Sequence, residues 1–259
     1  MPPGVTSPGG AGLHVVISCE HGGHVVPDAF AHCFAGQDNL LRTHEGYDLG
    51  AQDLAHDIAD AVGVSLHDSH MTRLLVELNR SPRHPRLFSR FTKSLPPDDK
   101  QHILDVHWHP YRDRVMADIQ AGLDAGKKVV HLSIHSFTPV FNDVERNCAF
   151  GLLYDPSRED KPTAHRWRDH LHQRLPGYRV RCNYPYTGVQ DGFQPWLRRR
   201  FAGTDYVAVE LETNNKFLVD EAAHQGASLA AKAPSHDDTA AFRAHVAHSV
   251  EDLLRTLTR

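Results

Sequence analysis

Two patterns of apolar residues alternate along the chain. Short runs rich in valine, isoleucine and leucine are typical of buried strands, and stretches with an apolar residue every three or four positions are typical of amphipathic helices. The first pattern predicts strands over residues 13–19, 64–66, 72–80, 129–134, 149–154, 177–183 and 205–212. The second predicts helices over residues 48–62, 98–125, 159–175, 192–201 and 239–257. Strands that alternate with helices predict an α/β fold in layers around a mostly parallel sheet.

Three stretches show neither pattern. Residues 1–12 are rich in proline and glycine, and no basic segment precedes an apolar one there, so we expect a flexible leader rather than a signal peptide. Residues 222–235 are expected to form a mobile linker. Residues 81–97 predict a long irregular loop of the kind that often serves as a lid. The remainder, residues 13–259, is expected to form a single domain.

Composition narrows the class of protein. Of the 259 residues, 40% are hydrophobic and 23% are charged, as in ordinary globular proteins, and the formal net charge is −4. The chain has no long basic run and no apolar stretch near 18 residues, so we expect neither a nucleic-acid partner nor a membrane span. The four cysteines show no CxxC spacing, which argues against a zinc ribbon and favours reduced thiols in the cytoplasm.

Imidazole and carboxylate side chains gather where predicted elements begin or end. His135 follows the run 129–134, Glu20 and His21 follow the strand 13–19, and Asp48 opens a helix. Because open α/β sheets bind ligands outside the carboxyl ends of their strands, we expect these groups to converge around a zinc ion. An N-terminal cap of the helix is the simpler interpretation of Asp48. The chain has 21 histidines, and we expect His102, His107 and His109, in a helical region that Pro110 kinks or splits, to be surface residues.

Two further clusters carry possible chemistry. Asn79 and Arg80 end the predicted strand 72–80, and the planar guanidinium fork of arginine matches a carboxylate. A turn with a solvated arginine is the alternative. Glu210 and Glu212 share one face of the strand 205–212, where a buried glutamate is unusual. Either is a candidate active-site carboxylate, and alternation alone does not choose between them.

Five motifs in order resemble the N-formylglutamate amidohydrolase family, over residues 13 to about 217. Each motif alone is weak, and the ordered set is fairly specific. The set is more distantly similar to zinc carboxypeptidases. The motifs are Ile17-Ser-Cys-Glu-His-Gly-Gly23, Gly46-Tyr-Asp48, Arg73-Leu-Leu-Val-Glu-Leu-Asn-Arg-Ser81, Ser133-Ile-His-Ser-Phe-Thr-Pro139 and Val209-Glu-Leu-Glu212.

The resemblance implies a zinc-dependent hydrolase with a three-layer α/β/α fold and a central mixed sheet, as in zinc carboxypeptidases. His21 and His135 match the first and last zinc ligands. The carboxypeptidases carry His-x-x-Glu, whereas His24 stands at the fourth position here, so Glu20, His24 and Asp48 are rival second ligands. Asp48 is favoured, because family members tend to keep an aspartate that opens this helix.

The resemblance also implies roles in substrate binding and proton transfer. Asn79 and Arg80 match a pair that grips a substrate carboxylate, and Glu210, rather than Glu212, matches the general base. Arg73 and Arg146 are candidates for stabilising a developing oxyanion, and Arg146 is also a candidate substrate-binding residue.

The expected activity is hydrolysis of the amide bond of a small N-acyl amino acid such as N-formylglutamate. The alternatives are a carboxypeptidase-like or cell-wall peptide amidase, and a non-catalytic carboxylate-binding protein on the same fold. The presence of Glu210 favours an enzyme. The sequence does not determine the oligomeric state.

Overall fold

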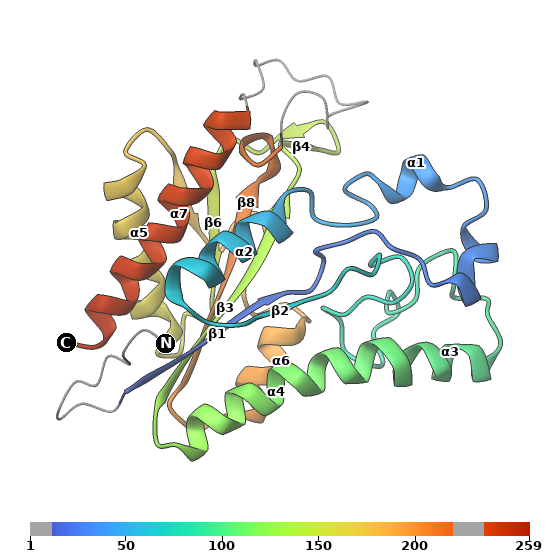
Figure 1. Cartoon of the computed structure of the whole chain (residues 1–259), viewed down its shortest axis with the longest axis horizontal. Coiled ribbons are helices and arrows are strands. Elements are labelled where there is room, and N and C mark those ends of the chain that lie inside the picture. The colour runs from blue at the N-terminus through green and yellow to red at the C-terminus, as the bar shows by residue number, and fades with distance from the viewer. Residues whose placement is uncertain (1–11, 220–235) are drawn as a thin grey trace.

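A mixed six-stranded sheet forms the centre of the molecule (Figure 1). The computed structural model describes residues 12–219 and 236–259, so the expected linker 222–235 and nearly all of the expected leader lie outside the described residues. Four strands run parallel, and the last two in the sheet order run the opposite way, because β6 is antiparallel to β8 and β7 is parallel to β6. The sheet order is β2 (Leu66–Asp68), β1 (Leu13–Cys19), β3 (Lys128–Phe137), β8 (Tyr206–Asn214), β6 (Phe150–Leu153) and β7 (Val180–Cys182).

Helices cover both faces of this sheet. One face packs against α2 (Ala51–Val62), α5 (Asp160–Arg174) and α7 (His236–Leu257), and α7 also contacts both of the other helices. The other face packs against α4 (His109–Asp124) and α6 (Phe193–Arg200). The predicted three-layer α/β/α fold with a mostly parallel mixed sheet is therefore confirmed.

Shorter elements complete the described chain. A helical extension leads into α4, and a small antiparallel hairpin follows β3. These elements are the 3-10 turns Asp28–Phe34 and Asn215–Phe217, α1 (Asp38–Leu41), α3 (Pro97–Ile103), a π-helical turn Leu104–Trp108, β4 (Val140–Phe141) and β5 (Val144–Glu145).

The two faces of the central strands differ in polarity. On β3, Val130, Leu132 and Ile134 belong to the apolar cluster under α2, α5 and α7. The alternate positions of β3 face α4 and α6, and there Val129 is followed by His131, Ser133 and His135 before the strand ends at Phe137. β1 and β8 repeat this change from apolar to polar toward their carboxyl ends. Buried polar groups therefore gather at one edge of one sheet face, where each needs a partner.

The prediction of a strand over residues 72–80 is wrong. The segment is buried and apolar at Leu74, Leu75 and Val76, but its backbone forms turns. Its amides bond over three residues, from Leu75 to Thr72 O (3.1 Å) and from Arg80 to Glu77 O (3.2 Å), instead of forming a ladder with a neighbouring strand. An apolar run indicates burial, and it does not by itself separate a strand from a buried turn.

Two helix boundaries also differ from expectation. Gly50, with φ +73°, caps α2, so Asp48 lies two residues before the cap and does not cap the helix through its side chain. Pro110 lies at the start of α4 and directly follows the π-helical turn. Because proline has no N–H to donate, the wider turn lets the helical path continue across it. The expected kink or break at Pro110 is thus replaced by a change of helix type, since α3, the π-helical turn and α4 follow one another without a gap.

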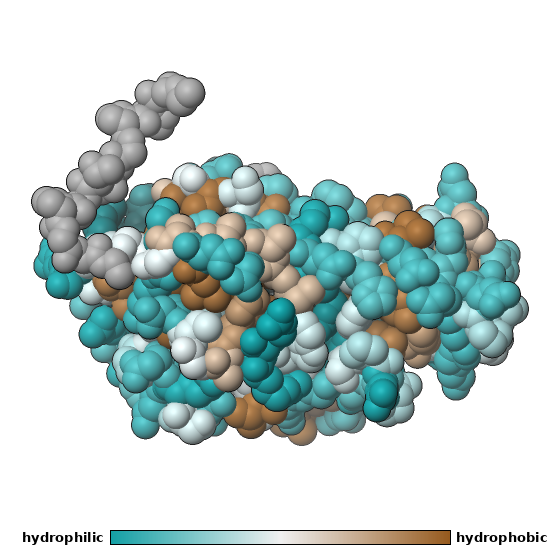
Figure 2. All heavy atoms as spheres, turned by 90° about the horizontal axis from the view of Figure 1, so that it is seen from below, coloured by the Kyte–Doolittle hydropathy of each residue, from teal (hydrophilic) through white to brown (hydrophobic). Residues whose placement is uncertain are grey.

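The surface carries no large hydrophobic region on the face in Figure 2, which is mainly hydrophilic with separate hydrophobic groups. Among the described helices, none is both long enough and apolar enough to cross a bilayer.

Candidate active site

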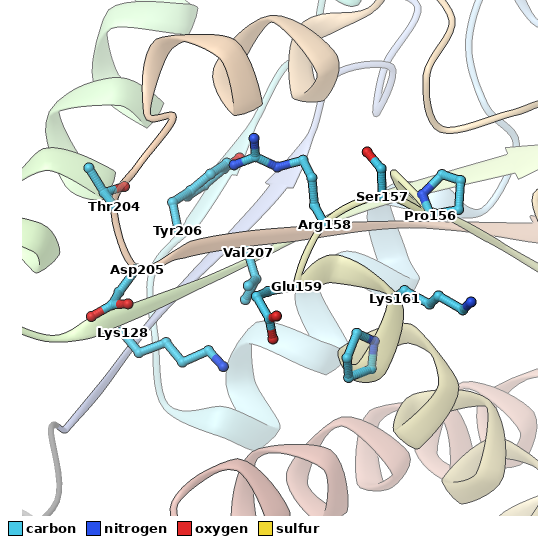
Figure 3. Close-up of a pocket in the computed structure, with 11 residues that line it drawn as sticks. Lys128, Pro156, Ser157, Arg158, Glu159, Lys161, Thr204, Asp205, Tyr206 and Val207 are labelled. Atoms are coloured by element: carbon cyan, nitrogen blue, oxygen red, sulfur yellow. The ribbon is translucent and has the colours of Figure 1, made fainter.

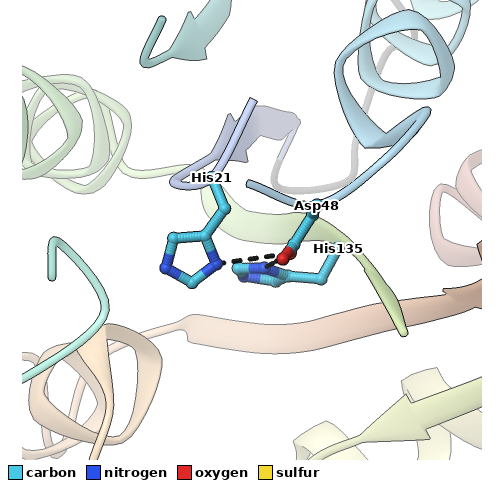
Figure 4. Close-up of side chains that lie close together, drawn as sticks. All are labelled: His21, Asp48 and His135. Atoms are coloured by element: carbon cyan, nitrogen blue, oxygen red, sulfur yellow. Dashed lines mark hydrogen bonds and ion pairs between the residues drawn. The ribbon is translucent and has the colours of Figure 1, made fainter. Parts of the chain in front are cut away.

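Three buried side chains meet at the carboxyl edge of the sheet (Figure 4). His21 follows β1, His135 lies near the end of β3, and Asp48 precedes α2. Asp48 Oδ2 lies 3.2 Å from His21 Nδ1 and 2.8 Å from His135 Nδ1. Their potential ligand atoms all lie within 4.8 Å of one another, which is compact enough for one metal ion.

The outward-facing nitrogens of both imidazoles contact buried carboxylates. His21 Nε2 bonds to Glu77 Oε1, and His135 Nε2 lies 3.0 Å from Glu20 Oε2. A carboxylate on Nε2 keeps the proton there, so Nδ1 can present its lone pair to a metal ion. Two such imidazoles and one carboxylate are the donor set of a catalytic zinc site that leaves a position open. The residues therefore fit a zinc ion.

The three candidates for the second metal ligand lie in different places in the structure. Asp48 joins the two histidines, whereas Glu20 lies behind His135. The Glu20 carboxylate accepts hydrogen bonds from Ser133 Oγ (2.6 Å) and Tyr111 OH (3.0 Å). His24 packs against the Tyr47 ring, 4.9 Å between centroids, and is not a member of the group.

Arg73 connects the group to its supporting carboxylates. Its Nη1 donates to Asp48 Oδ1 (3.0 Å), and its Nε and Nη2 donate to Glu77 Oε2 (2.9 and 2.6 Å). Burial opposes ionisation of both acids, but Arg73 and His21 hold the pKa values of Asp48 and Glu77 well below their ordinary values. Arg73 thus fixes the orientation of two buried carboxylates and supplies the permanent positive charge beside them.

Glu210 and Glu212 lie on the neighbouring strand, on the same face as the histidines. In the register of β3 and β8, Glu212 is opposite His135 and Glu210 is opposite Ser133. Burial raises the pKa of Glu210, and burial together with Asp48 and Glu210 raises the pKa of Glu212 to about 8. Within the described part of the chain, Glu212 Oε2 is buried and has no hydrogen-bond partner.

A cavity of about 420 Å³ opens over these groups. Its lining includes the three members of the His–Asp–His group and both β8 glutamates, and its walls come from three segments outside the sheet. The wall residues are Arg73, Asn79, Arg80 and Arg86 from the first segment, Phe141 from the β4–β5 hairpin, and Tyr186, Thr187, Gln190, Asp191 and Gly192 from the third.

The predicted carboxylate-binding pair lies in this wall. Asn79 Oδ1 accepts a hydrogen bond from Phe193 N (2.6 Å), and Arg80 Nη1 donates to Asp191 O. Beneath them, the buried guanidinium of Arg112 donates to Leu78 O (3.0 Å). These contacts hold the segment 78–80 against the start of α6 without using every donor of the Arg80 fork.

Arg146 is placed differently from the prediction. It is buried, it is not among the residues that line the cavity, and its guanidinium carbon lies 4.6 Å from the centroid of the Phe141 ring and 5.4 Å from that of Tyr186. It therefore supports two wall residues from below instead of facing the cavity.

Sequence reasoning missed several residues of the site. Glu77 and Arg86 carried no strand-end signal, because the first was assigned to a strand interior and the second to a loop. The spacing of Arg73 and Glu77, four residues apart, was a signal for an ion pair only if the segment were helical. His102 and His109 are exposed and His107 is half-buried, as expected, and none belongs to the metal-binding group.

A second cavity, of about 670 Å³, lies at the opposite edge of the sheet (Figure 3). Its lining includes Lys128 and Tyr206, which begin β3 and β8, and residues around the start of α5. This is the amino edge of the parallel strands, away from the His–Asp–His group. The chemistry of the lining, rather than volume, therefore identifies the candidate active site.

The fold and the site together define a three-layer α/β/α protein with a candidate metal-binding group at the carboxyl edge of its sheet. The chain belongs to the N-formylglutamate amidohydrolase family, whose sequence model matches residues 13–219.

Solved structures agree on the fold. The gene product Atu2144 from Agrobacterium tumefaciens superposes with a TM-score of 0.77 at 22% sequence identity, over 96% of this chain and 93% of that one. An N-formylglutamate amidohydrolase from Ralstonia eutropha JMP134 superposes with a TM-score of 0.67 at 16% identity, over 96% and 95% of the two chains. No curated protein sequence matches the chain.

We predict that Arg73→Met destabilises the metal-free protein, by about 3 kcal/mol, because the buried carboxylates of Asp48 and Glu77 lose the guanidinium that they share. Urea unfolding at pH 7 in the presence of a chelator measures this loss. Arg90→Met is the matched control: its ion pair with Glu45 is exposed, so its loss should cost less than about 1 kcal/mol. Equal small losses in both variants would contradict the orienting role of Arg73.

Proposed function

We propose that the protein is a zinc-dependent amidohydrolase that cleaves the amide bond of a small N-acyl amino acid, with N-formylglutamate as the first candidate. The observation that carries this proposal is the convergence of His21, Asp48 and His135 at the floor of a cavity that also contains two buried glutamates and an arginine-rich wall. Membership of the amidohydrolase family supports the reaction type.

His21 Nδ1, Asp48 Oδ2 and His135 Nδ1 are the atoms that would hold the zinc ion. Zinc supplies Lewis acidity, which activates a water molecule and polarises an amide carbonyl. Glu77 and Glu20 hold the two imidazoles by Nε2, so that neither ring is free to rotate away from the centre.

We propose that a glutamate of β8 acts as general base. It takes a proton from the attacking water, the water oxygen bonds to the acyl carbon, the carbon–nitrogen bond breaks, and the proton passes to the leaving amine. Two features support Glu212 in this role: its position opposite His135 and its unpaired buried Oε2, as judged within the described residues. Glu210, the residue favoured from sequence, is the alternative.

The carboxylate of the substrate is proposed to bind at Asn79 and Arg80. Arg80 lies at the cavity wall, and Arg86 adds a second cation there. A bidentate guanidinium would fix the carboxylate and thereby the position of the amide relative to the general base. Arg73 also lines the cavity, but its donors are occupied by Asp48 and Glu77, which supports a positioning role over the predicted oxyanion role.

The cavity favours a small substrate over the alternatives. A volume of about 420 Å³ is near the lower end of the range for small-molecule sites, whereas a peptide amidase needs an extended groove. A non-catalytic binding protein would have no need of two buried carboxylates whose pKa values are raised beside a candidate metal site. The expected cytoplasmic location stays a prediction.

We expect the protein to bind one zinc ion per chain and, when loaded with zinc, to hydrolyse N-formyl-L-glutamate. Chelation should abolish activity, and added zinc should restore it. His135→Ala should lose both metal and activity, whereas His107→Ala, a half-buried histidine outside the group, should keep both. Elemental analysis and release of formate are the measurements. Full activity in zinc-free protein would contradict the proposal.

We expect Glu212→Gln to lower turnover by roughly 10²–10⁴-fold, because the amide keeps the shape of the side chain but cannot accept the proton. Glu210→Gln should lower turnover much less. Both variants should be compared at equal zinc content, so that a loss of metal is not mistaken for a loss of the base. The reverse order of the two losses would assign the role to Glu210.

Arg80→Lys should weaken kcat/KM for N-formyl-L-glutamate by at least tenfold with zinc retained, because lysine keeps the charge and loses the planar fork. The matching control is N-formylglutamate capped as an amide at its α-carboxyl group, for which wild type and variant should be similarly poor. Efficient cleavage of the capped substrate by the wild-type protein would contradict the proposal that Asn79 and Arg80 bind the substrate carboxylate.

A further inference from the structure

Exposed apolar side chains cluster around the mouth of the candidate active site. Seven large hydrophobic side chains are exposed among the described residues, and five of them lie on the β4–β5 hairpin or on the loop that carries Tyr186. The five are Val140, Phe141, Val144, Tyr186 and Val189. Such a concentration on two short segments is not the scattered distribution that is normal for a protein surface.

The hairpin geometry orients two of these side chains to the same side. Phe141 and Val144 are directly opposite each other in the antiparallel pair, so they share one face, while Val140 pairs with Glu145 on the other face. Asn142 and Asp143 join the strands with φ values of +50° and +60°, as a tight two-residue hairpin turn requires. Phe141 lines the cavity, so Val144 extends the same face outward from it.

The second segment continues this surface. Tyr186 and its neighbours Thr187 and Gln190 line the cavity, and Val189 between them is 57% exposed. Arg146 lies against both the Phe141 ring and the Tyr186 ring, so it ties the hairpin to the loop. We call Phe141, Val144, Tyr186 and Val189 the apolar rim.

The apolar rim and the cationic residues come from different stretches of the chain. Arg73, Arg80 and Arg86 come from one segment, whereas the hairpin and the start of the 186–192 segment contribute Phe141 and Tyr186. An N-acyl amino acid has an anionic half and an acyl half on either side of the amide bond. If the anionic half binds at Arg80, the acyl half lies on the far side of the amide bond from Arg80, where Phe141 and Tyr186 are the aromatic residues of the lining.

We propose that the apolar rim is the binding subsite for an acyl chain longer than formyl. The inference rests on the proposed amidohydrolase function and goes beyond it, because a formyl group has no carbon atoms that could reach the rim. The reaction is the same hydrolysis: water and the N-acyl amino acid yield a free carboxylic acid and the free amino acid. The favoured substrate class is thus N-acyl amino acids with a short aliphatic chain.

The test compares N-formyl-, N-acetyl-, N-butyryl- and N-hexanoyl-L-glutamate with the zinc-loaded protein. Because the rim is partly solvated, each added methylene should raise kcat/KM about twofold, which corresponds to half the usual transfer free energy of a buried methylene. If kcat/KM stays constant or falls as the acyl chain lengthens, while the formyl compound is still hydrolysed, the rim proposal is overturned and the proposed function stands. No hydrolysis of any compound overturns both.

Variants separate the rim from a general effect of chain length. The test uses the double variant Val144→Ser/Val189→Ser and the single variant Phe141→Ser. In both, the kcat/KM for the hexanoyl compound divided by that for the formyl compound should fall to near one. This ratio does not depend on the amount of active protein. Val106→Ser is the matched control, since Val106 is 48% exposed and belongs to neither segment, and it should keep the wild-type ratio. An unchanged ratio in the rim variants overturns the proposal.

A second copy of the chain is the competing occupant of the rim. Analytical ultracentrifugation of wild type and the double variant distinguishes the two. A wild-type dimer that the double variant converts to monomer, together with a wild-type ratio in the variant, would identify the rim as a contact between copies and overturn the acyl-chain proposal.

Discussion

The site depends on one buried carboxylate, that of Asp48, being fully compensated. One of its oxygens meets the two imidazoles of His21 and His135, and the other accepts from Arg73. A carboxylate with little exposure to water is stable only with such partners. Each partner in turn needs its own, which Glu77 provides for His21 and Arg73, and Glu20 provides for His135. The metal-binding group is therefore the inner part of a larger charge network built from four separate stretches of chain.

The sheet supplies the positions for this network through its register. Side chains on one face of β1, β3 and β8 stay level with one another because the three strands are parallel and adjacent. Ser133 stands between Ser18 and Glu210, and His135 stands beside Glu212. A slip of one residue would turn these side chains to the apolar face under α5 and α7, so the apolar packing of that face fixes the register of the catalytic one. The apolar packing of one sheet face therefore both stabilises the core and sets the geometry of the site on the other face.

Sequence reasoning identified residues that the structure brings together where a polar group follows a strand end. His21, His135 and the two glutamates were identifiable because a polar group next to a β-branched run is conspicuous, and the carboxyl ends of parallel strands meet. The alternation also placed Glu210 and Glu212 on one face. The alternation of apolar and polar residues did not predict that Glu77 and Arg86 belong to the site, or that Arg146 is buried. These facts depend on how turns and loops pack against the sheet. The segment 72–80 illustrates the difference: its burial was predictable, but its turns are set by contacts with distant residues such as Gly46 and Leu87.

The β4–β5 hairpin is a separate two-stranded sheet, and neither of its strands pairs with the six-stranded one. It begins just after β3 ends, on the same edge as His135. Its length and side chains can therefore change without shifting the register on which the histidines and glutamates depend. For protein engineering, the hairpin is the place beside the candidate site where a new recognition loop can be grafted without altering a strand of the six-stranded sheet. An enzyme built in this way can acquire a new substrate by altering a few residues that take no part in its chemistry.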